Sequence, residues 1–464
     1  MVIITIITYM LQYLSMKTVF LFISNFVYSS DFLRTDYIKY LSTKYKVVVF
    51  MSPQAFCEDN KPYFKSENVT YVPWKLQNPG FWNLFGKYFR YSIIRKYDFE
   101  PVVVRNKEKG MKDWRRRFLK YFSYIAPASF WTNDLFTKLE KIFIPRSKAL
   151  EEKIKEYKPV MFLTATPGFS HPDAEAIIYA KKFGIKTAAI NFSWDNLHNG
   201  GVHFRRPDYL IVWNKIIKNT AVKEYGYSEN NVFVSGTMRF DSYSVNNPSE
   251  LSRETFLLSK GLNPKEKTIL ITTVTKGNYP DEDILLGELL KARDQGKFDG
   301  KPNILVRMHP KEEFDKFKVY IDSKIPNLHV EYPGKLLSQE MGTRIEIHED
   351  DILNLKLTLK YSDVVINYVS TMTLESFIFG KPVVNIDYPE KYHRAYNFRH
   401  YKPIVDADAV FLSKSFDNIV EHVNICLKNH DVKKKQQEKV FNDFIFFRDG
   451  LSYKRNVDFL EKII

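Results

Sequence analysis

The sequence predicts an α/β protein built from two doubly wound parallel sheets. Short β-branched runs alternate with helix-like segments along most of the chain, which is the pattern of strands joined by helical crossovers. A polar stretch, SVNNPSELSRE at 244–254, divides this alternation into two blocks. The length of 464 residues is enough for two domains of ordinary size.

The first block begins after Met16, and residues 80–157 interrupt it. Strands are expected at 18–24, 45–52, 68–74, 159–166, 186–193, 208–214 and 231–236. Helices are expected up to about Lys44, over 171–183 and between the last two strands. Residues 80–157 are rich in aromatic and basic residues and are expected to form a helical insertion within an N-terminal domain at 16–243.

The second block predicts a C-terminal domain at 244–430. Its strands are expected at 268–274, 303–309, 328–333, 363–367 and 383–386, with helices near 281–294 and 351–361. Parallel strands with right-handed crossovers make each block Rossmann-like, and we expect the two domains to face one cleft. Residues 431–464 are basic and amphipathic, and predict C-terminal helices that could cross back to the N-terminal domain.

Residues 1–15 are apolar but have no basic residue ahead of them, so they make a poor signal peptide. Lys17 interrupts the stretch after sixteen residues, short of the roughly 20 apolar residues that a membrane span needs. We interpret 1–15 as an apolar extension, with Met16 as an alternative start.

The overall charge favours polyanionic partners, because the formal net charge is +15. Nucleic acid, anionic lipid and phosphorylated substrates all remain open on this ground. Two cysteines, Cys57 and Cys426, argue against a disulfide scaffold and are typical of a reducing, cytoplasmic compartment.

Candidate functional residues come directly after strands, because ligands of doubly wound sheets bind at the carboxyl ends of the strands. The segment VINYVSTMTLESFIFGKPVVNI places Ser370, Thr371, Thr373 and Glu375 where a strand passes into a helix. A helix N-terminus attracts phosphate, and a carboxylate one turn later can accept hydrogen bonds from sugar hydroxyls. The alternative is an ordinary helix cap with a Glu in a capping-box-like place.

The RMHP sequence at 307–310 favours the phosphate site. Arg307 and His309 follow a β-branched strand, which puts two potential cations at the carboxyl edge of the same sheet.

These motifs resemble those of GT-B glycosyltransferases. The C-terminal half is similar to the branch with CDP-glycerol glycerophosphotransferases and bacterial surface-polysaccharide transferases, through RMHP and SDVVINYVSTMTLESFIFGKPVV at 362–384. The resemblance implies that Arg307 and His309 hold the donor phosphate and that Ser370, Thr371 and Thr373 supply N–H and hydroxyl contacts. It further implies that Glu375 holds ribose or sugar and that Lys276 contacts phosphate.

The N-terminal half resembles the same family through SWDNLHNGG, RRPDYLIVWNK and VFVSGTMRFD. Glycerophosphotransferases usually carry Trp-His-Gly in the first of these loops, where this chain has Trp194, Asp195 and Asn196. The departure favours sugar transfer over glycerophosphate transfer.

Asp195 is the candidate general base, because sugar transfer needs a group that takes the proton of the acceptor hydroxyl. Trp194, Asn196 and His171 are candidates for contact with the acceptor. An Asx-turn before Gly200 and Gly201 explains Asp195 equally well. Two further base candidates and one expected turn cap complete this set: Asp31, His171 and Asp241.

No metal or other cofactor is expected besides the nucleotide-sugar donor. The sequence has no closely spaced Cys/His set, no Asp-x-Asp at a strand end, no Walker motif and no G-x-G-x-x-G. Positive groups and a helix dipole would then stabilise the departing diphosphate.

Residues 81–124 mix cations with large aromatic side chains, as interfacial helices do. We expect peripheral contact with an anionic membrane, where a lipid-linked acceptor would lie, and no nucleic-acid partner. An ordinary helix with a solvated basic face is the alternative.

The predicted function is therefore metal-independent transfer of a sugar from a nucleotide-activated donor to a surface glycan or lipid-linked acceptor. Two alternatives stay open within the same fold: transfer of a CDP-linked polyol phosphate and 2-epimerisation of a nucleotide sugar. A non-enzymatic protein that binds nucleic acid or a glycan is the alternative from another class.

Overall fold

The computed structural model divides the chain into two compact units, Met1–Asp241 with Asp449–Ile464, and Ser242–Arg448. We refer to them as unit 1 and unit 2. The structure describes residues 16–24, 26–51, 64–74, 114, 118, 121, 138, 141–142, 144, 146–168, 171–199, 206–244, 250–275, 278–310, 314–338, 344–346 and 349–464. Residues 1–15 and nearly all of 80–145 lie outside this description, and with them the predictions made for those segments.

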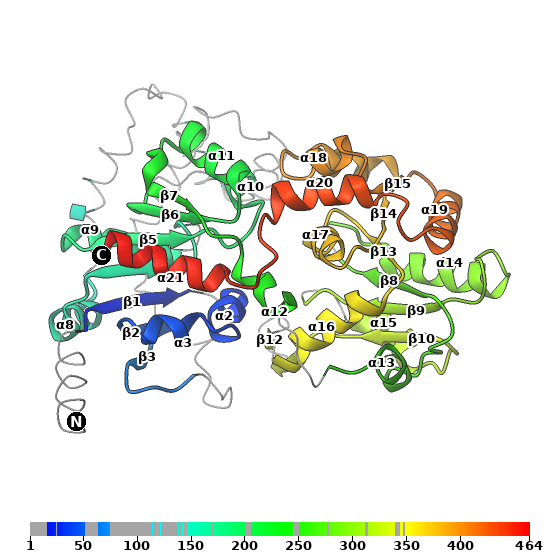
Figure 1. The fold of residues 1–464 in the computed structure, drawn as a ribbon, viewed down its shortest axis with the longest axis horizontal. Helices are drawn as coiled ribbons and strands as arrows, with labels where there is room; N and C mark the ends of the chain where they lie inside the picture. The colour runs from blue at the N-terminus through cyan, green and yellow to red at the C-terminus, as the bar shows by residue number, and fades with distance from the viewer. Residues whose placement is uncertain are drawn as a thin grey trace. The chain divides into compact units, whose positions relative to one another are not determined.

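Unit 1 contains a seven-stranded parallel sheet in the order β3-β2-β1-β4-β5-β6-β7 (Figure 1). The strands are β1 (Thr18–Ile23), β2 (Lys46–Met51), β3 (Val69–Pro73), β4 (Met161–Thr164), β5 (Lys186–Ile190), β6 (Tyr209–Val212) and β7 (Val232–Val234). The helices are α2 (Phe26–Leu33), α3 (Tyr37–Ser42), α8 (Lys148–Tyr157), α9 (His171–Lys182), α10 (Asn196–Asn199), α11 (Lys215–Tyr225), α12 (Asp241–Ser244), which begins at the boundary between the units, and α21 (Ser452–Ile463).

Both faces of this sheet are buried, because alternate residues of β1 enter two separate cores. Val19, Leu21 and Ile23 pack with residues of α2, α3 and α21. Phe20 and Phe22 point to the other face, where they pack with residues of α8 and α9. Strands that are covered on both faces read as continuous apolar runs, which is why the sequence marks them clearly.

Unit 2 contains a six-stranded parallel sheet in the order β10-β9-β8-β13-β14-β15. Its strands are β8 (Thr268–Thr272), β9 (Asn303–Arg307), β10 (Leu328–Glu331), β13 (Val364–Asn367), β14 (Val383–Ile386) and β15 (Phe411–Ser413). A small antiparallel hairpin consists of β11 (Lys335–Ser338) and β12 (Arg344–Glu346). The helices are α13 (Arg253–Ser259), α14 (Glu282–Asp294), α15 (Phe314–Asp322), α16 (Glu349–Tyr361), α17 (Thr371–Ile378), α18 (Lys402–Asp406), α19 (Phe416–Lys428) and α20 (Lys434–Phe444). The 3₁₀ segments of the chain are η1 (Glu229–Asn231) and η2 (Met238–Phe240) in unit 1 and η3 (Glu390–Asn397) in unit 2.

The predicted α/β class with two Rossmann-like parallel sheets is confirmed. The strands that we expected at 18–24, 268–274 and 303–309 all form, but each ends one or two residues earlier. The polar residues at those positions lie in the loops beyond the carboxyl ends of the strands. The sequence did not predict β15 or the β11–β12 hairpin, because these segments (FLS, KLLS and RIE) lack the runs of β-branched residues that mark the predicted strands of similar length.

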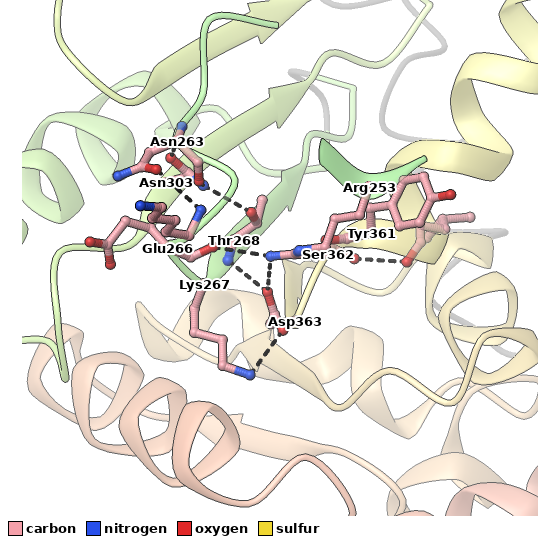
Figure 2. A network of polar contacts seen from close by, with 11 residues as sticks. Arg253, Asn263, Glu266, Lys267, Thr268, Asn303, Tyr361, Ser362 and Asp363 are labelled. Carbon is pink, nitrogen blue, oxygen red and sulfur yellow. Dashed lines mark hydrogen bonds and ion pairs between the residues drawn. The ribbon is translucent and has the colours of Figure 1, made fainter. Parts of the chain in front are cut away.

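A charged network ties together the amino edge of the unit 2 sheet (Figure 2). The Asp363 carboxylate accepts hydrogen bonds from Thr268 N–H at 2.8 Å and from the Arg253 guanidinium at 3.1 Å. Arg253 also donates to the carbonyls of Glu266 and Tyr361. These contacts join β8, β13 and α13 where the strands begin, so the network serves architecture and lies at the edge opposite to the carboxyl ends.

Asp241 caps α21 across a long sequence separation. Its carboxylate accepts from the N–H groups of Ser452 and Tyr453, at 3.0 and 2.8 Å. These N–H groups belong to the first turn of α21, which has no side-chain cap of its own at Leu451. The contact anchors the C-terminal helix in unit 1, where Val457 and Leu460 enter the core beside β1.

The stability of unit 1 should depend on pH through Asp241. Burial raises the pKa of this carboxyl from 3.8 to about 6, although the two backbone N–H groups favour its charged form. Between roughly pH 4 and 6 the folded state therefore binds more protons than the unfolded state, and stability falls as pH rises. Asp241→Asn lacks this titration, so the parent should lose about 1–3 kcal/mol relative to the variant across that window.

Urea unfolding of the parent and of Asp241→Asn at several pH values measures this difference. Asp36→Asn is the control, because it removes an exposed carboxylate just before α3. A stability difference between the parent and Asp241→Asn that stays constant from pH 4 to 7 would contradict the assignment.

Candidate functional site

The candidate donor site of unit 2 lies at the carboxyl edge of its sheet, where β9, β8, β13 and β14 lie side by side. The residues that follow these strands include Thr273 after β8, His309 after β9, Ser370 after β13 and Asp387 after β14. The connection between the β8 and β9 loops is direct, because His309 N–H donates to the Thr273 hydroxyl oxygen at 2.7 Å. Lys276, the other predicted phosphate contact, lies outside the described residues.

The turn between β13 and α17 is tightly constrained. Ser370 is the N-cap of α17, and its hydroxyl oxygen accepts from Met372 N–H at 3.2 Å. Val369, just before it, has a φ of +34°. This conformation is unusual for a β-branched residue, and such strain is a feature of turns that serve a function. Thr371, the first helical residue, is half-buried at this turn.

Thr373 lies inside the protein rather than at the surface of the turn. It is fully buried, and its hydroxyl donates to Asn367 Oδ1 at 3.1 Å and lies 2.7 Å from the hydroxyl of Tyr401. Asn385 Nδ2 donates to the same Asn367 oxygen at 2.6 Å. The network joins α17 to β13 and β14, so Thr373 fixes the position of the turn.

Glu375 is also buried, with 5% of its surface exposed. Its carboxylate accepts a hydrogen bond from the hydroxyl of Tyr243, another residue of unit 2. The capping-box alternative requires Glu or Gln three residues after the N-cap, a place that Thr373 occupies. A contact of Glu375 with donor ribose or sugar stays a prediction.

Arg307 forms ion pairs with two carboxylates. Its guanidinium lies 2.7 Å from Glu331 and 2.9 Å from Asp351, and the side chain is 7% exposed. Burial alone would raise the pKa of Glu331, but attraction to Arg307 and Lys260 holds it at about 2. Through these two ion pairs Arg307 connects β9, β10 and α16 instead of presenting its guanidinium to solvent.

In unit 1 the Trp194–Asp195–Asn196 loop follows β5 at the carboxyl edge of the first sheet. The Ser193 hydroxyl donates to the Asp195 carboxylate, and Ser193 N–H donates to Asn196 Oδ1 at 2.6 Å. Trp194 is buried, whereas Asp195 and Asn196 are half-buried. A turn forms here, in which Asn196 N–H donates to the Ser193 carbonyl at 3.2 Å and both side chains accept hydrogen bonds from Ser193.

Tyr28 and Asp173 belong to the surroundings of Asp195. The pKa of Tyr28 is raised to about 12, first by burial and then by the negative charges of Asp173 and Asp195. Asp173, fully buried, accepts a hydrogen bond from the Thr166 hydroxyl at 2.5 Å. Sequence reasoning missed Asp173, which lies two residues after His171 in the first turn of α9.

The other predicted base candidates occupy different places. Asp31 is buried, and its carboxylate lies 3.5 Å from Arg239. His171 is the first residue of α9. Asp241 caps α21, as described above.

Sequence reasoning also missed a pair formed by Asp387 and His393. Asp387 follows β14, and both of its carboxylate oxygens lie 2.8 Å from His393 Nδ1. An Asp directly after a β-branched strand with a His six residues later was the available signal.

Among the described residues, the structure contains no cluster of three or more His, Cys, Asp or Glu side chains that could hold a metal ion. Lys276 and residues 200–205 are among those that fall outside this search, so metal-independent chemistry stays an expectation.

Comparison of the sequence with protein-family models and with characterised proteins gives no match. Solved structures do match over nearly the whole chain. UDP-GlcNAc 2-epimerase from Neisseria meningitidis bound to UDP-GlcNAc has 14% identity and a TM-score of 0.51, covering 96% of this chain and 100% of that one. A glycosyltransferase from Rickettsia africae has 12% identity and a TM-score of 0.50, covering 97% and 99%. The wall teichoic acid polymerase TagF has 12% identity and a TM-score of 0.51, covering 96% and 88%.

If Arg307 is a structural residue, its removal should destabilise unit 2. Arg307→Met leaves the buried Glu331 and the partly buried Asp351 without their shared cation, and we expect a loss of about 3–5 kcal/mol. Lys267→Met, which removes a half-exposed partner of Asp363, is the control and should cost less than about 1 kcal/mol. Chemical denaturation measures both values. Parental stability together with lost nucleotide affinity in Arg307→Met would return Arg307 to the phosphate-binding role.

The matched structures carry different activities on one architecture, and at 12–14% identity the likeness concerns the fold. With its two Rossmann-like parallel-sheet units, the chain has the GT-B fold.

Proposed function

We propose that the protein is a metal-independent glycosyltransferase that transfers a sugar from a nucleotide-activated donor to a surface glycan or lipid-linked acceptor. The observation that carries the proposal is the constrained β13–α17 turn of unit 2. This turn combines a capped helix start with the strained backbone of Val369. His309 lies in the loop after β9, at the same carboxyl edge of the parallel sheet. Nucleotide phosphates bind at this place in doubly wound folds.

The donor would be held by the turn from several directions. The N–H groups at the start of α17 and the hydroxyls of Ser370 and Thr371 would contact its phosphates, with the His309 imidazole as a further partner. Glu375 would accept from a ribose or sugar hydroxyl after exchanging its contact with Tyr243. Thr373 would act indirectly, because its buried bonds to Asn367 and Tyr401 fix the helix start.

Asp195 is proposed as the general base. The acceptor oxygen forms a bond to the anomeric carbon, the bond between that carbon and the diphosphate oxygen breaks, and its electron pair leaves with the diphosphate. The acceptor proton passes to the Asp195 carboxylate. Asp195 is half-buried and bound by Ser193, which fixes its orientation for such a transfer.

Nucleotide-sugar 2-epimerisation is the second candidate, because several of the matched structures are described as UDP-GlcNAc 2-epimerases. An epimerase needs no acceptor and returns a nucleotide sugar, whereas a transferase releases the nucleotide diphosphate. The matched structure of the wall teichoic acid polymerase TagF contains a ligand abbreviated CDPG. Polyol-phosphate transfer is therefore a further alternative.

The proposal is tested by a panel of UDP-, CDP-, GDP- and ADP-sugars, first in thermal unfolding and then in turnover. A ligand at 100 times its dissociation constant stabilises the protein by about 2.7 kcal/mol. Asp195→Asn should bind the donor as the parent does but lose about 10²–10⁴ in the rate of diphosphate release. Chromatography of the products separates transfer from epimerisation.

Glu229→Gln, which removes a carboxylate elsewhere in unit 1 from a side chain that is 78% exposed, is the matched control. Near-parental turnover of Asp195→Asn would exclude it as the base and move attention to Asp173. If no nucleotide sugar binds the parent, the enzymatic proposal fails and a non-enzymatic binding protein becomes the better description.

We further propose that residues 81–124 contact an anionic membrane. Most of this segment lies outside the described residues, but Trp114, Phe118 and Tyr121 are helical and are 70%, 61% and 68% exposed. Their separations of four and three residues are those of neighbours on one face of a helix. None of the helices that the structure describes has the length and apolar character needed to cross a bilayer. The contact is proposed as peripheral.

Vesicle co-sedimentation tests the membrane proposal. The parent should bind vesicles that contain anionic lipid, and added salt should weaken the binding because each Lys or Arg at such a surface contributes about 1 kcal/mol. Changing Trp114, Phe118 and Tyr121 together to Ser should reduce binding. The matched control changes three exposed apolar residues of unit 2 to Ser: Leu258, Ile284 and Val319. An equal effect of both triple variants, or no binding of the parent at low salt, would refute the proposal.

A further inference from the structure

His393 is an exposed imidazole whose orientation is fixed by a buried carboxylate. Its side chain is 47% exposed, whereas that of Asp387 is 1% exposed. Both carboxylate oxygens lie 2.8 Å from Nδ1, so Asp387 binds this nitrogen of the ring and not Nε2. A carboxylate that fixes one imidazole nitrogen orients the ring for work at the other.

The segment that carries His393 is attached directly to the candidate donor turn. The Tyr368 hydroxyl donates to the Tyr392 carbonyl at 2.8 Å, and the Tyr396 hydroxyl donates to the Ile386 carbonyl at 2.6 Å. The ring centroids of Tyr368 lie 5.8 Å from Tyr392 and 5.7 Å from Tyr396. Tyr368 is two residues before Ser370, so these contacts hold the β13–α17 turn and η3 together in one packed group.

The exposed side of this segment is mostly basic. Lys391 and Arg394 flank His393, and all three are exposed, with Glu390 the one exposed carboxylate of η3. Burial raises the pKa of Tyr368, and the positive charge of Arg394 opposes this rise. Basic side chains therefore lie in η3, the segment after β14 that packs against the turn.

The donor site needs such a cation because Arg307 is already neutralised. Glu331 and Asp351 occupy its guanidinium inside the protein. A diphosphate bound at the α17 N-terminus would therefore need a charged side-chain partner other than Arg307.

We propose that His393, held by Asp387, binds the diphosphate of the donor nucleotide at the β13–α17 turn. This proposal rests on the proposed function. It gives His393, in the segment after β14, the phosphate-binding role that the sequence predicted for Arg307. The protonated imidazole would donate from Nε2–H to a diphosphate oxygen while Nδ1–H donates to Asp387. This arrangement gives a charge-assisted hydrogen bond whose direction is fixed before the ligand arrives.

A purely structural pair would behave differently. If Asp387 and His393 only fastened η3 to β14, removal of the imidazole would lower stability and would weaken every ligand of the site to a similar degree. A diphosphate contact predicts a loss that depends on the phosphates of the ligand.

Calorimetry with UDP, CDP, GDP and ADP first identifies the diphosphate that the parent binds, and the corresponding nucleoside is then measured. His393→Ala should weaken the diphosphate by about tenfold to a hundredfold and leave the nucleoside within about twofold. His393→Gln, which keeps a hydrogen-bond donor without the charge, should fall between the parent and His393→Ala. His430→Ala is the matched control, because it removes another exposed His that faces an Asp, 3.6 Å away in its case.

Thermal unfolding of each variant checks that the fold is kept. Equal losses for the diphosphate and the nucleoside, or an unchanged diphosphate affinity in His393→Ala, would overturn the assignment while the proposed function stands. If the parent binds none of the diphosphates, the proposed function itself fails and this inference fails with it.

Discussion

A row of buried polar side chains crosses the unit 2 sheet at the carboxyl ends of its strands, and the geometry of the candidate site depends on it. Glu331 pairs in register with Arg307, Arg307 with Thr272, and Asn367 with Asn385. Because Ile271 pairs with Ile366, Thr272 and Asn367 are the next positions of adjacent strands. Residues in register point to the same face of a parallel sheet, so the row runs through five strands, and each member is at most 7% exposed.

This row connects the strands to the helices that follow them. At one end, Arg307 and Glu331 bind side chains of α16, Asp351 and Asn354. At the other end, Asn367 and Asn385 bind Thr373 of α17 and the Tyr401 hydroxyl. Not every atom of the row is satisfied, because the Thr272 hydroxyl and Asn367 Nδ2 are buried without a hydrogen-bond partner. The bonds that the row does form would cost about 1–3 kcal/mol each to break inside the protein, so they restrict the arrangement of the helices that they contact. The helix start at Ser370 is therefore held in place before any ligand binds.

The sequence predicted the strands of both sheets well, because buried parallel strands are continuous β-branched or aromatic runs. It also placed Ser370 at a helix start and identified the loop after β9. It could not assign the partners of Arg307, since Glu331 and Asp351 lie 24 and 44 residues away and only folding brings them together. The same limit explains Asp241, whose helix begins 211 residues later, and Thr373, whose hydroxyl reads as a ligand contact until Asn367 and Tyr401 surround it.

The two edges of the unit 2 sheet show how burial separates architecture from recognition. At the amino edge, Asp363 binds Arg253 and Lys267, cations that are 32% and 55% exposed, so water screens these pairs and they contribute modestly. At the carboxyl edge the polar row is buried, and beyond it lie partly exposed groups: Ser370, His309 and His393. The buried polar contacts are rigid, and the partly exposed groups beyond them are accessible to solvent. The arrangement is therefore preorganised, so that binding of the proposed anion would require little loss of side-chain conformational entropy. Arg307 of the RMHP sequence thus contributes to the rigid layer in this chain, and the proposed recognition of the donor is assigned to the groups that the row supports.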